Sequence, residues 1–252
     1  MTTPTRRDFN HALLGTLAAY GLIETLFRHD AFAESVKPVI TKWMGELNAL
    51  SKDLKADRKL KDTEFQTKLE ELYKRVKLAD LLTLLDLDRV ARTAKLPDNG
   101  ALSSGIDLSK VEGLPARLYF GKQIFGLKKG RSIVPHGHSN MCTGFIILRG
   151  TFAGKHYDRV EDHAKHYLIK PTIDRAFKAG EFSTVSDHKD NVHWFKATSD
   201  QAFIFNIHVI GYDPKVKGSS GRLYLDPQGE KVKGGLILAK KMTSSECHKK
   251  YG

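Results

Sequence analysis

The chain has 252 residues, enough for one well-buried barrel and a smaller helical part. Hydrophobic residues make up 40% of it, which argues against wholesale disorder, and two cysteines are too few for a disulfide scaffold. The formal net charge is +12, but Lys and Arg are spread along the whole chain without a compact basic run interleaved with aromatics, so nucleic-acid binding is not indicated.

The first segment has the three parts of a secretory signal. Arg6 and Arg7 lie in a charged start, an apolar run covers 12–23, and residues 31–33 read Ala-Phe-Ala. The paired arginines resemble the twin-arginine type, so we expect the twin-arginine export machinery as a partner, cleavage of residues 1–33 and a periplasmic or otherwise exported protein. The apolar run is too short to span a bilayer comfortably. A retained anchor is the alternative, and no stable membrane span is expected after cleavage.

A helical arm is predicted over residues 34–100. Apolar side chains recur at steps of three and four over 36–54, over 65–76 and over 81–90, with charged residues between them. This period predicts amphipathic helices, and the Pro-Asp-Asn-Gly turn cluster at 97–100 ends the segment. We expect these helices to pack on the neighbouring domain; a partner-binding or membrane-surface arm is the alternative.

Short apolar runs at regular intervals follow, from about residue 114 to 240, punctuated by Gly, Asn and Asp. This spacing is typical of an all-β sandwich or jelly roll. No Gly-rich loop joins a strand to a helix in the way that a nucleotide-binding fold requires. The predicted fold class is therefore mostly β, with a barrel and a C-terminal tail over 101–252 after the α-helical arm.

Three histidines in these runs have the spacing of a metal site. His136 and His138 are one residue apart, so on a strand their side chains point to the same face, and His193 lies in a later run. Inside a barrel the three can converge on a divalent ion and leave roughly three of six octahedral positions open. With a glycine on either side, the pair is similar to the first motif of the cupin jelly-roll barrel. That motif usually has a Glu where this chain has Thr143, so we predict a neutral site without a carboxylate.

Five short motifs surround or follow these histidines: His136-Gly-His138-Ser-Asn-Met141, Leu148-Arg-Gly150, Lys155-His-Tyr157-Asp158, Asp190-Asn-Val-His193-Trp-Phe195 and Tyr212-Asp-Pro214. Together they resemble the plant cysteine oxidase and cysteamine dioxygenase family of thiol dioxygenases, whose members also lack the cupin glutamate. The chain departs from the family at Asp190, where the family has Gly. It also departs in its predicted export, because members of the family act inside cells.

The resemblance implies that His136, His138 and His193 hold Fe(II), that a small or peptide thiol binds as thiolate, and that O2 adds both atoms to sulfur to give a sulfinate. It makes Tyr157 and Asp158 candidate catalytic residues that orient a ligand or hold the amino end of the substrate, with a plain strand residue and turn residue as the alternative. Three imidazoles do not select iron by affinity, so Mn, Ni and Zn stay open. For the whole chain, the alternative is a non-catalytic metal-bearing cupin that binds or senses a small ligand.

Three further histidines fall in a stretch that we interpret as a polar loop, with a second metal site as the alternative: His156, His163 and His166. His208 lies in an apolar strand and is expected to be a core residue or to line the cavity. If Thr143 faces inward, Cys142 faces outward and is not a ligand. A disulfide between Cys142 and Cys247 is an open alternative, although the Lys-rich tail around Cys247 is expected to be loosely held.

Overall fold

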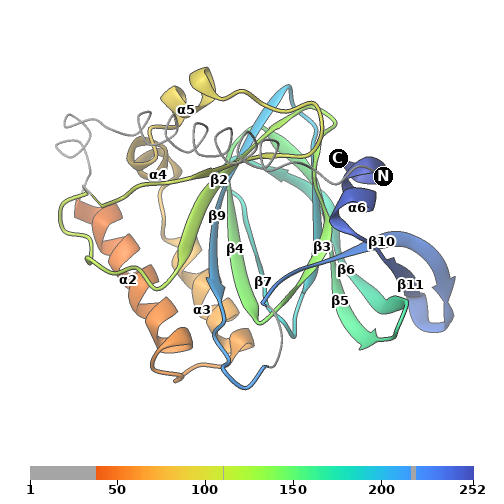
Figure 1. The fold of residues 1–252 in the computed structure, drawn as a ribbon. Coiled ribbons are helices and arrows are strands. Elements are labelled where there is room, and N and C mark those ends of the chain that lie inside the picture. The colour runs from red at the N-terminus through yellow and green to blue at the C-terminus, as the bar shows by residue number, and fades with distance from the viewer. Residues whose placement is uncertain (1–37, 110, 217–219) are drawn as a thin grey trace, which may run out of the picture.

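The computed structural model describes residues 38–109, 111–216 and 220–252, so the predicted signal segment lies outside the described residues. The helices have the following bounds: α2 (Pro38–Lys55), α3 (Asp62–Lys74), α4 (Leu78–Leu84), α5 (Leu87–Thr93) and α6 (Ser244–Tyr251). In Figure 1, α2 to α5 lie on one side of the strands and α6 lies on the other. No helix in the described ranges is both long and apolar enough to cross a bilayer.

The other elements of the described ranges are strands and the 3-10 turn η2 (Lys233–Gly235). The strands are β1 (Leu102–Gly105), β2 (Gly121–Lys128), β3 (Ser132–Ser139), β4 (Met141–Arg149), β5 (Thr151–Asp162), β6 (His166–Lys178), β7 (Phe182–Val185), β8 (Val192–Ala197), β9 (Gln201–Ile210), β10 (Gly221–Val232) and β11 (Leu236–Lys241).

The strand order is that of a jelly roll. One sheet runs β1-β2-β9-β4-β7, and the other contains β3-β8-β5-β6, which β11 and β10 extend until β10 pairs back onto β3. If the strands from β2 to β9 are renumbered from one to eight, the two sheets read 1-8-3-6 and 2-7-4-5. This is the connectivity of two interlocked Greek keys. The predicted mostly β fold, a cupin-type jelly-roll barrel with an N-terminal α-helical arm, is confirmed.

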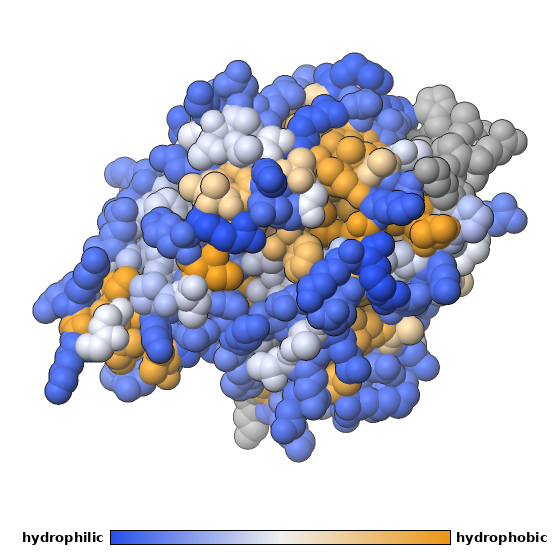
Figure 2. All heavy atoms as spheres, turned by 180° about the vertical axis from the view of Figure 1, so that it is seen from behind, coloured by the Kyte–Doolittle hydropathy of each residue, from blue (hydrophilic) through white to orange (hydrophobic). Residues whose placement is uncertain are grey.

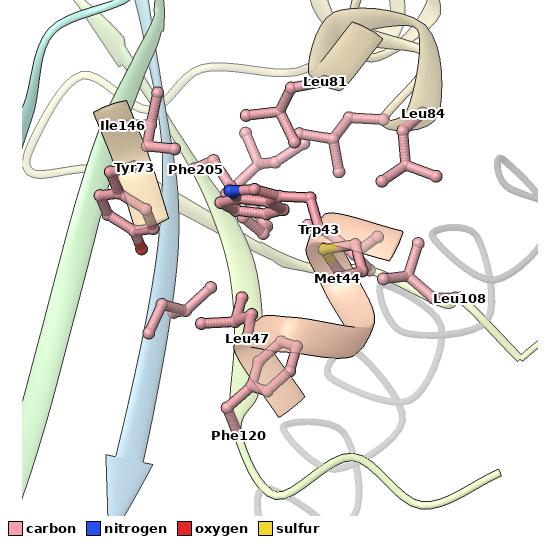
Figure 3. Packing of buried hydrophobic residues seen from close by; sticks show 14 of the residues in the cluster. Trp43, Met44, Leu47, Tyr73, Leu81, Leu84, Leu108, Phe120, Ile146 and Phe205 are labelled. Carbon is pink, nitrogen blue, oxygen red and sulfur yellow. The ribbon is translucent and has the colours of Figure 1, made fainter. Parts of the chain in front are cut away.

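The helices cover the outer face of the sheet that contains β9. Side chains alternate along β9, so Phe205 and Ile207 point outward to the helices while Ile204 points into the barrel. Figure 3 shows Trp43 and Leu47 of α2 packed in this outer cluster with barrel residues such as Phe205. The Trp43 indole N–H donates to the carbonyl oxygen of Leu72 at 2.8 Å, which ties α2 to α3.

The third apolar set of the arm forms two short helices, α4 and α5, instead of one. The break falls at Asp86, whose φ of 44° is left-handed. Among non-glycine residues, Asp and Asn tolerate this conformation best. The chain can therefore turn between two helices that both keep leucines in the core, such as Leu84 and Leu87.

The C-terminal tail is not loosely held, and that prediction was wrong. Residues 244–251 form α6, which begins at a capping box between Thr243 and Glu246. The thiol of Cys247 is fully buried and donates to the carbonyl oxygen of Pro135 at 3.3 Å, which anchors α6 to β3. Cys142 lies in the helix-facing cluster, and both cysteines are free.

Hydrophilic side chains cover most of the face shown in Figure 2, with smaller apolar areas between them. Most of the described acidic and basic groups that pair lie on the exposed surface, as in the ion pair between Arg75 and Glu46 at 2.8 Å. Such exposed pairs contribute little to stability. The buried apolar clusters therefore provide the main stabilisation of this fold.

Candidate metal centre

The three predicted histidines meet inside the barrel. His136 and His138 come from β3, and His193 on the adjacent β8 is the direct cross-strand partner of His136. Their ring centroids are 4.2 Å (His136 to His193), 4.9 Å (His138 to His193) and 5.1 Å (His136 to His138) apart. Each residue is at most 2% exposed. The structure therefore brings the three histidines together as a possible metal site.

Each of the three rings has a polar contact at Nδ1. The Nδ1 atom of His136 lies 2.7 Å from the carbonyl oxygen of Val134, and that of His193 lies 3.4 Å from the carbonyl oxygen of Asn191. Because a carbonyl only accepts, these Nδ1 atoms donate, and each Nε2 keeps its lone pair for a metal. The Nδ1 atom of His138 lies 3.4 Å from the hydroxyl of Thr143, which is the residue at the position of the cupin glutamate.

The distances fit one shared ion. One ligand nitrogen from each ring lies within 4.8 Å of the others. Two nitrogens bound to the same ion at about 2.0–2.1 Å are at most about 4.2 Å apart, so a small inward movement of the rings completes the site. The residues present therefore fit a divalent metal held by three imidazoles.

The electrostatics keep these rings neutral. Burial lowers the pKa of His136 and His193 well below the usual value and that of His138 to about 3, and the positive charge of Arg222 lowers each pKa further. A neutral imidazole has a lone pair that can bind a metal, so protons do not compete with the metal for these rings at physiological pH. No carboxylate belongs to this group of ligands in the described part of the chain. A bound ion would therefore keep its full 2+ charge, which favours direct binding of an anion.

A side-chain clamp fixes the backbone at His138 of β3. The Asn191 amide accepts from the His138 N–H at 3.2 Å through Oδ1, and donates from Nδ2 to the His138 carbonyl oxygen at 3.0 Å. Gly137 makes room for this clamp, since a Cβ there would lie 2.4 Å from Asn191 Oδ1. The glycine in the His-Gly-His motif and the Asn two residues before His193 therefore act as one unit.

The turn before β8 accommodates Asp190 without a glycine. Asp190 has a φ of 54°, a left-handed conformation that Gly adopts freely and Asp tolerates. Its backbone N–H donates to the Asp158 carboxylate at 2.8 Å, and its own carboxylate accepts from the Thr172 hydroxyl at 2.5 Å. Asp158 thus holds the turn that leads to His193 and is not brought together with the histidines.

Tyr157 lies on the other face of β5 from the metal site. It pairs with Val192, the neighbour of His193 that points away from the three rings, and it packs in a separate cluster with Tyr167 and Ile169. Burial raises the pKa of Tyr157 to about 12, so its hydroxyl stays protonated at neutral pH. The structure does not bring Tyr157 to the histidines.

His156 is not in a loop, and that interpretation was wrong. It lies in β5 directly opposite His193, is completely buried, and has its ring centroid 6.1 Å from that of His193. Its Nε2 is 3.2 Å from the Ser183 hydroxyl, while its Nδ1 has no partner in the described structure. The period of two that starts at the buried Phe152 is the sequence signal that identifies His156 as an inward residue.

His163 and His166, the other two histidines of the predicted polar loop, do lie at a turn near the surface. His163 and His166 stack at the β5–β6 hairpin with ring centroids 4.6 Å apart, and His163 pairs with Glu161 at 3.0 Å. In the described residues they are not part of a group that fits a metal, so the alternative of a second metal site has no support there.

Comparison with known proteins gives a fold likeness only. No family model matches the sequence, and no curated protein matches it. Among solved structures, procruciferin, an 11S globulin from Brassica napus, aligns with a TM-score of 0.37 and 12% identity over 54% of this chain and 30% of its own. The chain therefore spans less than a third of procruciferin.

Two further solved structures align in the same way. An uncharacterised conserved protein with a double-stranded β-helix domain from Klebsiella pneumoniae gives a TM-score of 0.36 at 11% identity, over 53% of this chain and 85% of that one. An oxalate oxidase gives a TM-score of 0.36 at 14% identity, over 51% and 56%. At these TM-scores the likenesses carry no argument about activity. The jelly roll rests on the strand order, and the possible metal site rests on its three buried histidines.

Proposed function

We propose that the protein is an exported Fe(II)-dependent thiol dioxygenase. The observation that supports this function best is a buried site of three neutral histidines with no acidic ligand among the described residues. The sequence motifs that resemble the thiol dioxygenases carry the same three histidines. In the proposed reaction a thiol R–SH and O2 give a sulfinate R–SO2⁻ and a proton. Sulfur forms two bonds to oxygen and loses four electrons, which reduce both oxygen atoms.

The chain's own residues have three tasks in this reaction. His136, His138 and His193 would hold the ion, and Fe(II) bound there would supply a Lewis-acidic, redox-active centre for the thiolate and O2. Phe145, whose ring centroid is 5.0 Å from that of His193, belongs to the apolar cluster that fills the barrel beside the site and excludes water. The Asn191 clamp fixes the backbone of His138.

Metal identity and location are part of the proposal. Three imidazoles also bind Mn, Ni or Zn, so iron is inferred from the proposed chemistry and not from the ligand set.

Export of the protein is inferred from the predicted signal segment, residues 1–33. Replacement of Arg6 and Arg7 by Lys should retain the protein in the cytoplasm during cell fractionation, whereas an unchanged distribution would contradict twin-arginine export.

The activity is tested with protein loaded anaerobically with Fe(II) and then given O2 and a panel of small thiols and Cys-containing peptides. We expect consumption of one O2 per thiol and a product that gains two oxygen atoms, both labelled when 18O2 is used. His193→Ala should abolish both signals. If metal-loaded protein neither consumes O2 nor forms a sulfinate with any member of the panel, the dioxygenase proposal is wrong, and a non-catalytic metal-bearing cupin remains.

A further inference from the structure

An arginine from the end of the chain faces the three-histidine site. Arg222 lies at the start of β10, which runs beside β3, and it is the direct cross-strand partner of His138. Residues paired across antiparallel strands project to the same face of the sheet. Because the imidazole of His138 projects into the barrel, the side chain of Arg222 starts on that inner face too.

The position of the guanidinium confirms this direction. Its central carbon lies 5.8 Å from the ring centroid of Phe125, an inward residue of β2 in the opposite sheet. The Arg222 side chain therefore extends from β10 toward the opposite sheet, across the end of the barrel next to the three histidines, which we call the opening. Its positive charge lowers the pKa of His136, His138 and His193.

The guanidinium is available to a ligand. Arg222 is exposed, and in the described part of the chain it makes no ion pair and no hydrogen bond with a side chain. By contrast, another arginine on the barrel, Arg175, pairs with Glu181 at 3.2 Å. The charged groups that act most strongly on the three histidines are Arg222 and other histidines, with no carboxylate among them. Among the described residues, the opening therefore presents a guanidinium that contacts the Phe125 ring but has no ion-pair partner, and no carboxylate acts on the three histidines.

A second polar group lies on the same inner face. His208 of β9 is the cross-strand partner of both Thr143 and Gly121, and the absence of a side chain at Gly121 makes room for its ring. Its Nδ1 is buried without a partner in the described structure. His208 also lines a pocket of about 260 Å³ together with Lys55 and Arg117, and none of the described residues that line it is an Asp or Glu.

We propose that Arg222 binds a carboxylate on the substrate, so that the site selects thiols that also carry an acidic group. The inference rests on the proposed function. A substrate of this class presents two anionic ends, the thiolate at the metal and the carboxylate at the guanidinium, whose planar fork of N–H donors matches a carboxylate. An amino thiol without a carboxylate brings a positive charge into an opening that is already cationic, and it binds weakly. This departs from the amino-bearing substrate that the resemblance implies, because Asp158, a candidate to hold the amino end, lies at the Asp190 turn and not at the histidines.

The test compares three small thiols that differ in one end group: 3-mercaptopropionate (anionic), 2-mercaptoethanol (neutral) and cysteamine (cationic). Binding to Fe(II)-loaded protein is measured anaerobically by calorimetry, which does not depend on turnover. We expect the wild-type protein to bind 3-mercaptopropionate roughly tenfold or more tightly than 2-mercaptoethanol, because a charge-assisted bond is added, and cysteamine to bind most weakly. Arg222→Gln should remove this preference without changing the affinity for 2-mercaptoethanol. Arg222→Lys, which keeps the charge but not the fork, should retain part of it.

Arg159 provides the matched control. Its guanidinium carbon also lies over an aromatic ring, 5.7 Å from the centroid of Tyr167, but that ring belongs to the separate cluster with Tyr157, away from the three histidines. Arg159→Gln should leave the order of affinities unchanged. Equal affinities of the wild-type protein for the three thiols would overturn the inference, as would an intact preference in Arg222→Gln with an unchanged melting temperature.

The outcomes separate this inference from the proposed function. If the preference depends on Arg222 but no thiol yields a sulfinate, the carboxylate site stands and the dioxygenase proposal falls. If all three thiols give sulfinate with the same KM in the wild-type protein and in Arg222→Gln, the dioxygenase stands and the carboxylate site falls.

Discussion

At the scale of single residues, the metal site depends on groups that do not touch the metal. Asn191 joins the backbone of β3 to the turn before β8, and Asp158 holds that turn through Asp190. The clamp sets the spacing between His138 and His193. Substitutions at these supporting positions should therefore affect metal affinity while every ligand remains in place.

Gly137→Ala tests the clamp. The added Cβ would lie 2.4 Å from Asn191 Oδ1, so either the amide or the strand must move. We expect metal affinity to fall roughly 10- to 100-fold, as for other groups that orient metal ligands, measured by competition with a chelator. Gly105→Ala is the control, because a Cβ there meets nothing within 4 Å. Equal affinities of the two variants would contradict a role for the clamp.

His156 should make the metal-free protein sensitive to acid. Burial, followed by the charge of Arg175, lowers its pKa in the folded state to about 3, below the value of about 6.5 in an unfolded chain. Between these two pKa values, His156 is protonated in the unfolded chain and neutral in the folded chain. The stability that the neutral ring contributes is present above pH 6.5 and is lost as the pH falls toward 3.

His156→Gln removes this titration. Between pH 7 and about pH 4.5, the metal-free wild-type protein should lose roughly 2–3 kcal/mol more free energy of unfolding than the variant, measured with urea. The other buried histidines are common to both proteins and cancel in the comparison. Parallel loss of stability in the two proteins would show that His156 is not buried in its neutral form.

The residues of the metal site were predictable to different degrees. The period of two along a strand placed His136 and His138 on one face, and it also placed Thr143 inward and Cys142 outward, as the structure confirms. Tyr157 follows the same period of two: as the neighbour of the inward His156 it faces the other side of β5, where it pairs with Val192 and joins a separate cluster.

At the scale of elements, the helical arm is a layer that shields the back of the barrel. Its amphipathic period predicted α2 and α3 well, since each buries one apolar face against the sheet. The division into α4 and α5 was not predicted, because it depends on one left-handed residue, Asp86. The Thr-x-x-Glu capping box at the start of α6 predicts a helix there, but the charged composition of the tail led us to expect a loosely held segment.

Leu47→Ala tests whether this layer stabilises the fold without shaping the metal site. Leu47 is completely buried between α2 and the barrel (Figure 3), so we expect a loss of about 2–5 kcal/mol in the free energy of unfolding and an unchanged metal content. Val39→Ala on the same helix is the control, because Val39 is 63% exposed and should cost under about 0.5 kcal/mol. Loss of metal in folded Leu47→Ala would contradict the separation of the two layers.

At the scale of the whole molecule, the site is made by pairings between distant parts of the chain. β3 lies between β8 and β10, which brings His193 and Arg222 to the two sides of the His136–His138 strand. The regular spacing of apolar runs predicted a barrel, but the order of strands within it follows from long-range pairing. For this reason Arg222 could not be assigned to the site from the sequence.

The most direct test of the three-histidine site is the metal content of purified protein after equilibration with Fe(II) and removal of free ion. We predict about one ion per folded chain for the wild-type protein and for His166→Ala, which alters only the exposed hairpin. We predict nearly complete loss of the ion in His193→Ala with an unchanged circular dichroism spectrum. A folded His193→Ala variant that keeps one ion per chain would show that these three histidines are not the metal site.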